Sequence, residues 1–156
     1  MMEETRDLTT LTRSVPKMFD AGAHAVADYA TAGAFAALGL YFHNRNRRAA
    51  QLAYANAAAI VGLSMLTDYP GGMFPVFSFR AHGQADLALT ALATAGPAML
   101  GIANDPAARV FYGAAGLETA IVSSTDWSSG GNGRTDTMYV TPREEWLEGP
   151  DAPWNT

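Results

Sequence analysis

The chain has 156 residues, which is enough for one domain, and 49% of these residues are apolar. Its net charge is −5 with a single lysine, Lys17, and this acidic balance excludes nucleic acid as an expected partner. The absence of cysteine excludes disulfide bonds, a thiolate nucleophile and a cysteine-bound metal or cluster.

Four apolar segments follow a polar N-terminal segment, residues 1–17. They lie at about 21–42, 49–66, 82–103 and 108–124. Each is close to the roughly 20 residues that cross a bilayer. No charged residue lies in 29–44, 49–67, 69–79 or 87–104, whereas the helices of a soluble domain carry charges on one face. The sequence therefore predicts an all-α integral membrane four-helix bundle over residues 18–127. A soluble, alanine-rich four-helix bundle is the alternative.

A polar C-terminal segment, residues 128–156, follows the fourth apolar segment. It begins with several Gly and Ser residues, and its prolines discourage a long helix. Tyr139, Trp146 and Trp154 have no core of their own in so polar a stretch, and such aromatic residues commonly anchor on another surface. We expect this segment to be a docking tail for a partner protein. A disordered tail is the alternative.

The chain also contains an internal repeat. Unusual residues match without a gap when the sequence is laid on itself with an offset of 58, as the pairs His24/His82, Asp28/Asp86, Thr67/Thr125, Asp68/Asp126 and Tyr69/Trp127. Each unit, 24–69 and 82–127, contains His-x-x-x-Asp, a helix, a polar turn, a second helix and Thr-Asp-aromatic. Two crossings return the chain to its starting side. The units should therefore be related by a pseudo-twofold axis along the membrane normal.

The repeated residues resemble a known family. The motifs His24-x-x-x-Asp28, Leu66-Thr67-Asp68-Tyr69 and Arg80-Ala81-His82-x-x-x-Asp86 are similar to those of small bacterial membrane proteins of the SPW-repeat type. The resemblance covers about residues 17–127, and the Ser-Pro-Trp tripeptide itself is not kept. It implies four transmembrane helices in two repeats in the bacterial inner membrane, and no settled biochemical activity.

Ionisable side chains gather at one end of the expected bundle. The i,i+4 spacing places His24 over Asp28, and His82 over Asp86, on one helix face. The expected cluster comprises His24, Asp28, Asp68, Arg80, His82, Asp86 and Asp126. It has four interpretations. These are a hydrogen-bonded structural clasp with Arg80 as counter-ion, a site for Zn, Mn or Fe, a pair of axial histidines for haem or chlorophyll, and a proton relay.

Glu118 lies in the middle of the fourth apolar segment, where its equivalent in the first unit is Ile60. A carboxylate inside a membrane is a functional candidate by default. The alternative is that Glu118 bonds Asn56 or Tyr54 inside the bundle, or a polar group on a neighbouring subunit.

The sequence lacks Gly-x-Ser-x-Gly, P-loop and His-Glu-x-x-His motifs. We therefore expect a non-catalytic accessory or structural subunit of a larger membrane complex, with other membrane subunits as partners. The alternative is a membrane redox protein that binds haem, chlorophyll or a metal through His24, His82 and the aspartates. The basic residues Arg45, Arg47 and Arg48 indicate that the short turns face the cytoplasm, which puts the termini on the periplasmic side.

Overall fold

Four helices make up most of the protein. The structure is a computed structural model that describes residues 15–130. The helices are α1 (Ala21–Phe42), α2 (Arg47–Met65), α3 (Phe79–Met99) and α4 (Ala108–Ser124). Two short strands, β1 (Thr67–Asp68) and β2 (Phe77–Ser78), lie between α2 and α3 and pair in parallel. The predicted all-α class is confirmed, whereas the docking tail lies outside the described residues except for its start, 128–130.

The helix ends follow from their caps. The predicted spans 21–42 and 108–124 are confirmed, whereas α2 and α3 each begin earlier than predicted. Helix α2 begins at Arg47 because the Asn46 side chain accepts a hydrogen bond from the Ala49 N–H. In the same way, the Ser78 side chain accepts a hydrogen bond from the Ala81 N–H, and α3 begins at Phe79. Helix α3 ends at Met99, two residues before Gly101, whose φ of 67° lies in the left-handed region.

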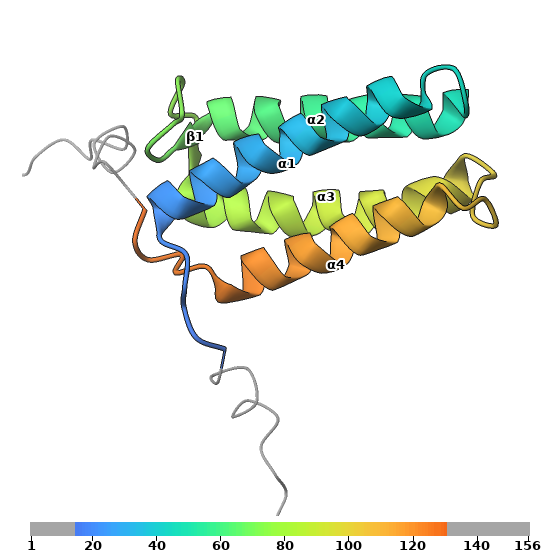
Figure 1. Cartoon of the computed structure of the whole chain (residues 1–156). Coiled ribbons are helices and arrows are strands. Elements are labelled where there is room, and N and C mark those ends of the chain that lie inside the picture. Colours follow the sequence, from blue (N-terminus) through green and yellow to red (C-terminus); the bar gives the residue numbers. More distant parts are fainter. Residues whose placement is uncertain (1–14, 131–156) are drawn as a thin grey trace, which may run out of the picture.

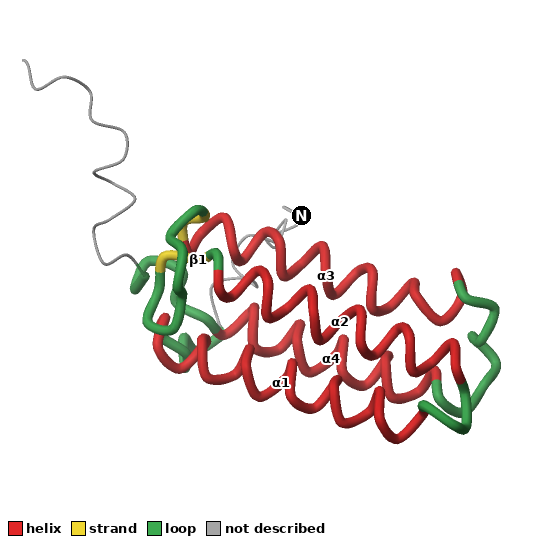
Figure 2. The backbone as a smooth tube through the Cα atoms, turned by 90° about the horizontal axis from the view of Figure 1, so that it is seen from above, coloured by secondary structure: helices red, strands yellow, loops and turns green. Residues whose placement is uncertain are grey.

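The helices run along one common direction and form two hairpins (Figures 1 and 2). Helix α1 packs along α2, α3 packs along α4, and α2 joins the hairpins by packing against α3. The short turns lie at one end of the bundle, and the two ends of the described chain lie together at the other (Figure 1). There the Met18 N–H donates to the Ser124 carbonyl over 2.8 Å.

The strand pairings at that end recur with the repeat offset. Thr67 lies opposite Phe77 in the parallel pair of β1 and β2. An isolated parallel bridge joins Phe19 to Thr125. Phe19 lies 58 residues before Phe77, and Thr67 lies 58 residues before Thr125. In each bridge, the Thr that ends one unit therefore pairs with the Phe that precedes the other unit.

The interior is built from two clusters of apolar side chains. The larger one lies toward the turn end and packs Phe35, Phe42 and Phe111 against alanines of α2. The smaller one lies where the described chain begins and ends, and it comprises Ala21, Ala25, Tyr69 and Phe79 with Trp127 packed against it. The candidate site described below lies beside this smaller cluster.

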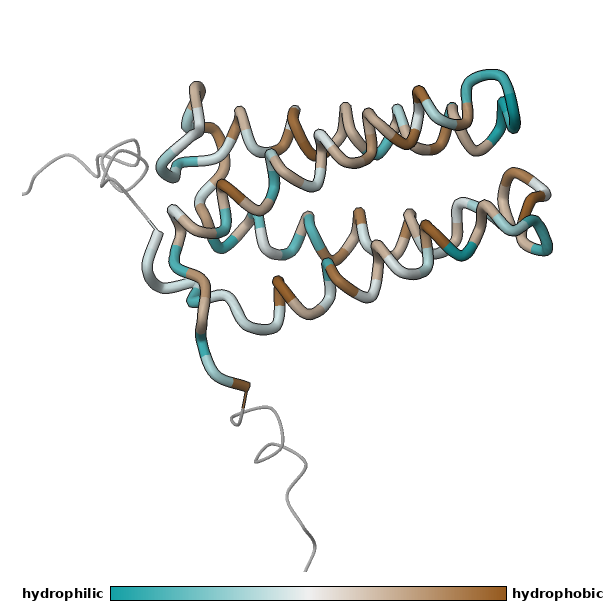
Figure 3. Tube along the Cα trace, in the orientation of Figure 1, coloured by the Kyte–Doolittle hydropathy of each residue, from teal (hydrophilic) through white to brown (hydrophobic). Residues whose placement is uncertain are grey.

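One helix meets the length and hydropathy expected of a membrane crossing. Among the described helices this is α1, Ala21–Phe42. Helix α4 has 17 residues. Helix α2 begins with two arginines, and α3 carries Arg80, His82 and Asp86 in its first half. The longest hydrophilic stretch of the described chain lies in the turn between α1 and α2, and single hydrophilic residues also occur within the helices (Figure 3). By this measure, one of the four predicted membrane crossings is met among the described helices, namely α1.

Candidate metal centre

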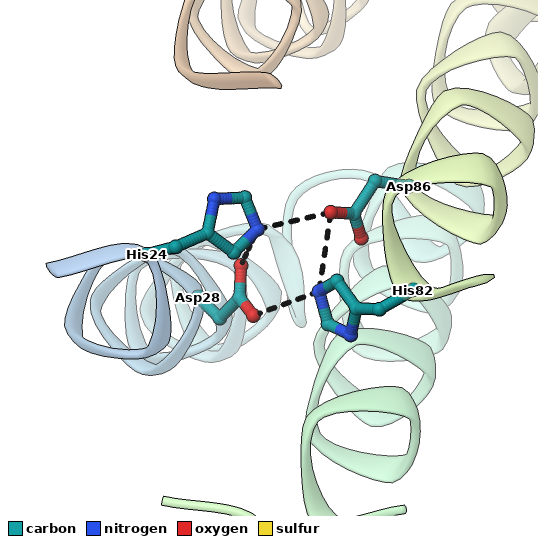
Figure 4. A group of neighbouring side chains, drawn as sticks. All are labelled: His24, Asp28, His82 and Asp86. Atoms are coloured by element: carbon teal, nitrogen blue, oxygen red, sulfur yellow. Dashed lines mark hydrogen bonds and ion pairs between the residues drawn. The ribbon is translucent and has the colours of Figure 1, made fainter. Parts of the chain in front are cut away.

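Four buried side chains from α1 and α3 converge between the two hairpins. We call His24, Asp28, His82 and Asp86 the quartet. The exposed fractions of these residues are 0%, 3%, 0% and 4%. One ligand atom from each lies within 4.8 Å of the other three (Figure 4). The i,i+4 spacing predicted within each helix places one His and one Asp on the inward face of α1, and again on that of α3.

The ring nitrogens Nε2 of both histidines face both carboxylates. The Nε2 atom of His24 lies 3.0 Å from Asp86 Oδ2 and 3.4 Å from Asp28 Oδ1. The Nε2 atom of His82 lies 3.1 Å from Asp28 Oδ2 and 3.1 Å from Asp86 Oδ2. Neighbouring ligand atoms of a tetrahedral zinc site, with bonds of about 2.0–2.1 Å, lie about 3.3–3.4 Å apart. The four nitrogen–oxygen distances of the quartet are close to this value. With one ligand atom from each residue the set lies within 4.8 Å, so a tetrahedral ion would draw the side chains somewhat closer together.

Threonine hydroxyls determine which ring nitrogen of each histidine carries a proton. Thr67 Oγ1 donates to the Leu63 carbonyl and lies 2.7 Å from Nδ1 of His82. A hydroxyl has one hydrogen, so Thr67 must accept from the Nδ1–H of His82. Thr125 Oγ1 donates to the Ile121 carbonyl and lies 2.9 Å from Nδ1 of His24, which gives the same assignment.

A neutral imidazole of the quartet therefore points an unprotonated Nε2 at two carboxylates. Lone pairs of nitrogen and oxygen repel at such distances, so a cation must lie between them. A divalent ion would neutralise the two aspartates. Two protons, one on each Nε2, would do the same and would give the structural clasp. His82 Nε2 is fully buried and lies 3.1 Å from an oxygen of each aspartate, so a proton or a metal ion at this position would be held by both carboxylates.

The quartet geometry does not suit an axial ligand of haem or chlorophyll. A macrocycle held by His24 or His82 would occupy the space directly beyond Nε2. The carboxylates of Asp28 and Asp86 already lie there, at 3.0–3.4 Å from the two nitrogens. Zn, Mn or Fe in a set of two imidazoles and two carboxylates needs no such space.

Asp28 is held in place by two hydroxyl donors. The Tyr69 hydroxyl donates to Asp28 Oδ2 over 2.9 Å, and the Ser64 hydroxyl donates to the same atom over 3.1 Å. Burial, with a contribution from the Asp28 charge, raises the pKa of Tyr69 above its usual value, so the phenol keeps its proton. Both donors orient the Asp28 carboxylate toward the histidines.

Aromatic rings cover the quartet at the end of the bundle. The ring of Trp127 lies 4.8 Å, centre to centre, from those of both His24 and Phe79. The ring of Tyr69 lies 5.3 Å from that of His82. Because Phe79 and Tyr69 are each 2% exposed, water is largely kept from this face of the site.

The other predicted members of the cluster lie outside the quartet. Asp68 is buried in β1, and the Arg80 side chain is exposed near the start of α3. Asp126 is partly exposed and accepts hydrogen bonds from Ser128, which hold the pKa of Asp126 below its usual range. Glu118 is half-buried in α4, whereas the Asn56 side chain donates to the Leu52 carbonyl of its own helix. Tyr139, Trp146 and Trp154 lie outside the described residues.

Four residues that hydrogen-bond to the quartet were not predicted as members of the site: Thr67, Thr125, Ser64 and Tyr69. The recurrence of Thr67 at Thr125 was a sufficient signal for the two threonines, because both follow the repeat that relates the histidines. Ser64 has no such signal, since its equivalent in the second unit is Val122. Comparison of the chain with protein-family models, with curated proteins and with solved structures gives no match. The resemblance to SPW-repeat proteins therefore stays a prediction.

Replacing Tyr69 by Phe is expected to lower the free energy of unfolding by about 1–3 kcal/mol, because the buried Asp28 carboxylate loses a donor. Tyr29→Phe is the matched control, since the Tyr29 hydroxyl donates to the Gly71 carbonyl at a more exposed position. Thermal unfolding of the detergent-solubilised variants measures both effects. Equal losses in the two variants would contradict a special role for Tyr69.

Proposed function

We propose that this protein is a membrane protein that binds one divalent metal ion in the quartet. The observation that carries the proposal is the assignment of both Nδ1–H groups to threonines, because it turns both Nε2 atoms toward the carboxylates. Two imidazole nitrogens and two carboxylate oxygens suit Zn²⁺, and also Mn²⁺ or Fe²⁺. When bound, the ion would link α1 to α3.

The direct test is the metal content of the full-length protein purified in mild detergent. Equilibrium dialysis against ZnCl₂ should leave one tightly held Zn²⁺ per chain, measured by elemental analysis after removal of free metal. A protein that holds no zinc, and no manganese after the same treatment with MnCl₂, would leave the proton-filled clasp as the better explanation.

The placement of charge supports four membrane crossings rather than one. Within residues 15–130, the charged side chains lie near the two ends of the bundle, apart from Asp28 and Asp86 of the quartet and Glu118. Large apolar side chains are exposed between these ends, among them Val26, Leu87, Leu92 and Leu117. Such a surface suits lipid, and alanine-rich helices with low hydropathy can still insert when they pack on each other.

We further propose that the two units are related by a pseudo-twofold axis along the membrane normal. The equivalent contacts of Thr67 with His82 and of Thr125 with His24 support this relation, as do the two bridges described above. The axis would pass through the quartet. The basic residues at the short turns support an orientation in which those turns face the cytoplasm of a bacterial cell and the quartet lies near the periplasmic side.

Cysteine labelling tests this orientation without background, because the chain has no cysteine. Asn44→Cys lies in the turn between α1 and α2, and Ser128→Cys follows α4; both positions are exposed. In intact cells, a membrane-impermeant maleimide should label Ser128→Cys, and it should label Asn44→Cys only after permeabilisation. Labelling of both from outside would rule out a chain that crosses four times.

The metal would have a structural role in an accessory subunit without catalytic activity of its own. All four positions of a tetrahedral ion would be taken by protein ligands, which is typical of structural sites. The partners would be other membrane protein subunits, in contact with the exposed apolar helix faces and the tail 128–156. Purification from native membranes in mild detergent should recover such a complex. A chain that elutes alone and uncomplexed would argue against the accessory role.

A further inference from the structure

A small cavity lies inside the bundle next to the quartet. All four helices line it, and Asp86 is the member of the quartet that reaches it. Its volume, about 20 Å³ for the centre of a water molecule, compares with the roughly 10–15 Å³ that one water needs. The cavity therefore has room for one particle of the size of a water molecule or a bare metal ion.

Each polar side chain that lines this cavity can offer an oxygen atom as a ligand. Glu118 and Asp86 each supply a carboxylate to the lining. Thr90 supplies a hydroxyl whose oxygen is fully buried and has no hydrogen-bond partner among the described residues. Asn56 donates its amide N–H to the Leu52 carbonyl, which leaves its Oδ1 as the atom for a ligand. Carboxylate, amide and hydroxyl oxygens together are the ligand set of a hard divalent cation.

The charges in the cavity also favour a cation. Two carboxylates line it and no lysine or arginine does. Apart from Asn56 and Thr90, the remaining lining is apolar. A carboxylate in such surroundings is stabilised by a nearby cation, and without one it binds a proton. Glu118 has no counterpart in the first unit, where the equivalent residue, Ile60, lines the same cavity. The second unit therefore carries a carboxylate where the first unit has an apolar side chain.

Asp86 can serve both sites. Its contacts with the two histidines of the quartet both use Oδ2. The second oxygen, Oδ1, is therefore available to an ion on the cavity side. A carboxylate that bridges two ions in this way is a common feature of two-metal sites.

We propose that the cavity is a second cation site, formed by Glu118, Asn56, Thr90 and the bridging carboxylate of Asp86, and that it takes a hard divalent cation such as Mn²⁺. The proposal rests on the proposed metal ion of the quartet, because the two sites share Asp86.

Binding of Mn²⁺ alone to the full-length protein tests the second site. The wild type should hold two Mn²⁺ per chain, one more weakly than the other, and Glu118→Gln should hold one. Thr90→Val should lower the affinity for the second ion by roughly 10–100-fold, which is the usual effect of losing a supporting polar group. The affinity for the first ion should stay unchanged. Thr94→Val is the matched control, since Thr94 lies one turn further along α3 and is exposed.

The outcomes separate this proposal from the one it rests on. One Mn²⁺ in both the wild type and Glu118→Gln, or two in both, would overturn the second site and leave the quartet ion in place. No Mn²⁺ in the wild type, together with no Zn²⁺, would overturn the quartet ion as well. Circular dichroism of each variant checks its fold, and Thr90→Val keeps the test valid if Glu118→Gln does not fold.

Discussion

Replacing His82 by alanine is expected to weaken binding of the divalent ion by about a hundredfold or more. Four-ligand zinc sites bind with roughly 10–16 kcal/mol, so each ligand contributes about 3 kcal/mol. His43→Ala is the matched control, because His43 is exposed in the turn between α1 and α2, at the far end of the bundle. Competition with a chromogenic zinc chelator measures both affinities.

Thermal unfolding distinguishes the metal site from the clasp. Zinc at about a thousandfold excess over its dissociation constant should add roughly 4 kcal/mol to the free energy of unfolding of the wild type, and little to that of His82→Ala. Chelation should then bring the wild type close to the variant. If His82→Ala is destabilised by the same amount with and without zinc, the histidine acts as a hydrogen-bonding clasp.

Replacing Thr67 by valine is expected to lower the affinity of the quartet for the divalent ion by about 10–100-fold, although Thr67 itself would not bind the ion. The hydroxyl accepts the Nδ1–H of His82 and thereby keeps Nε2 turned toward the carboxylates. Thr125→Val should have a similar effect through His24. The same chelator competition measures these affinities.

Thr119→Val is the control for the threonine variants. The Thr119 hydroxyl donates to the Ala115 carbonyl four residues earlier, as Thr67 does to that of Leu63, but it is not bonded to a histidine. An unchanged affinity in Thr67→Val and Thr125→Val would show that the threonines do not control the histidine tautomer. An equal loss in Thr119→Val would point to a general effect of losing the backbone bond.

The sequence by itself predicted the helices, and it placed the four members of the quartet within a larger cluster of seven residues. Each His-x-x-x-Asp motif is local, since helix geometry alone places residues i and i+4 on one face. The 58-residue offset then brought the two motifs to the same end of the bundle, as predicted from two hairpins of equal length.

The tertiary structure decided which neighbours join the quartet. Sequence reasoning placed Asp68 and Asp126 in the cluster because they follow the second helix of each unit. The chain is extended there, and successive side chains of an extended segment point to opposite sides. Thr67 and Thr125 consequently reach the histidines, and the aspartate that follows each of them starts from the opposite side of the backbone. The contact of Ser64 with Asp28 depends on how α1 packs on α2, because no local pattern relates residues 36 positions apart.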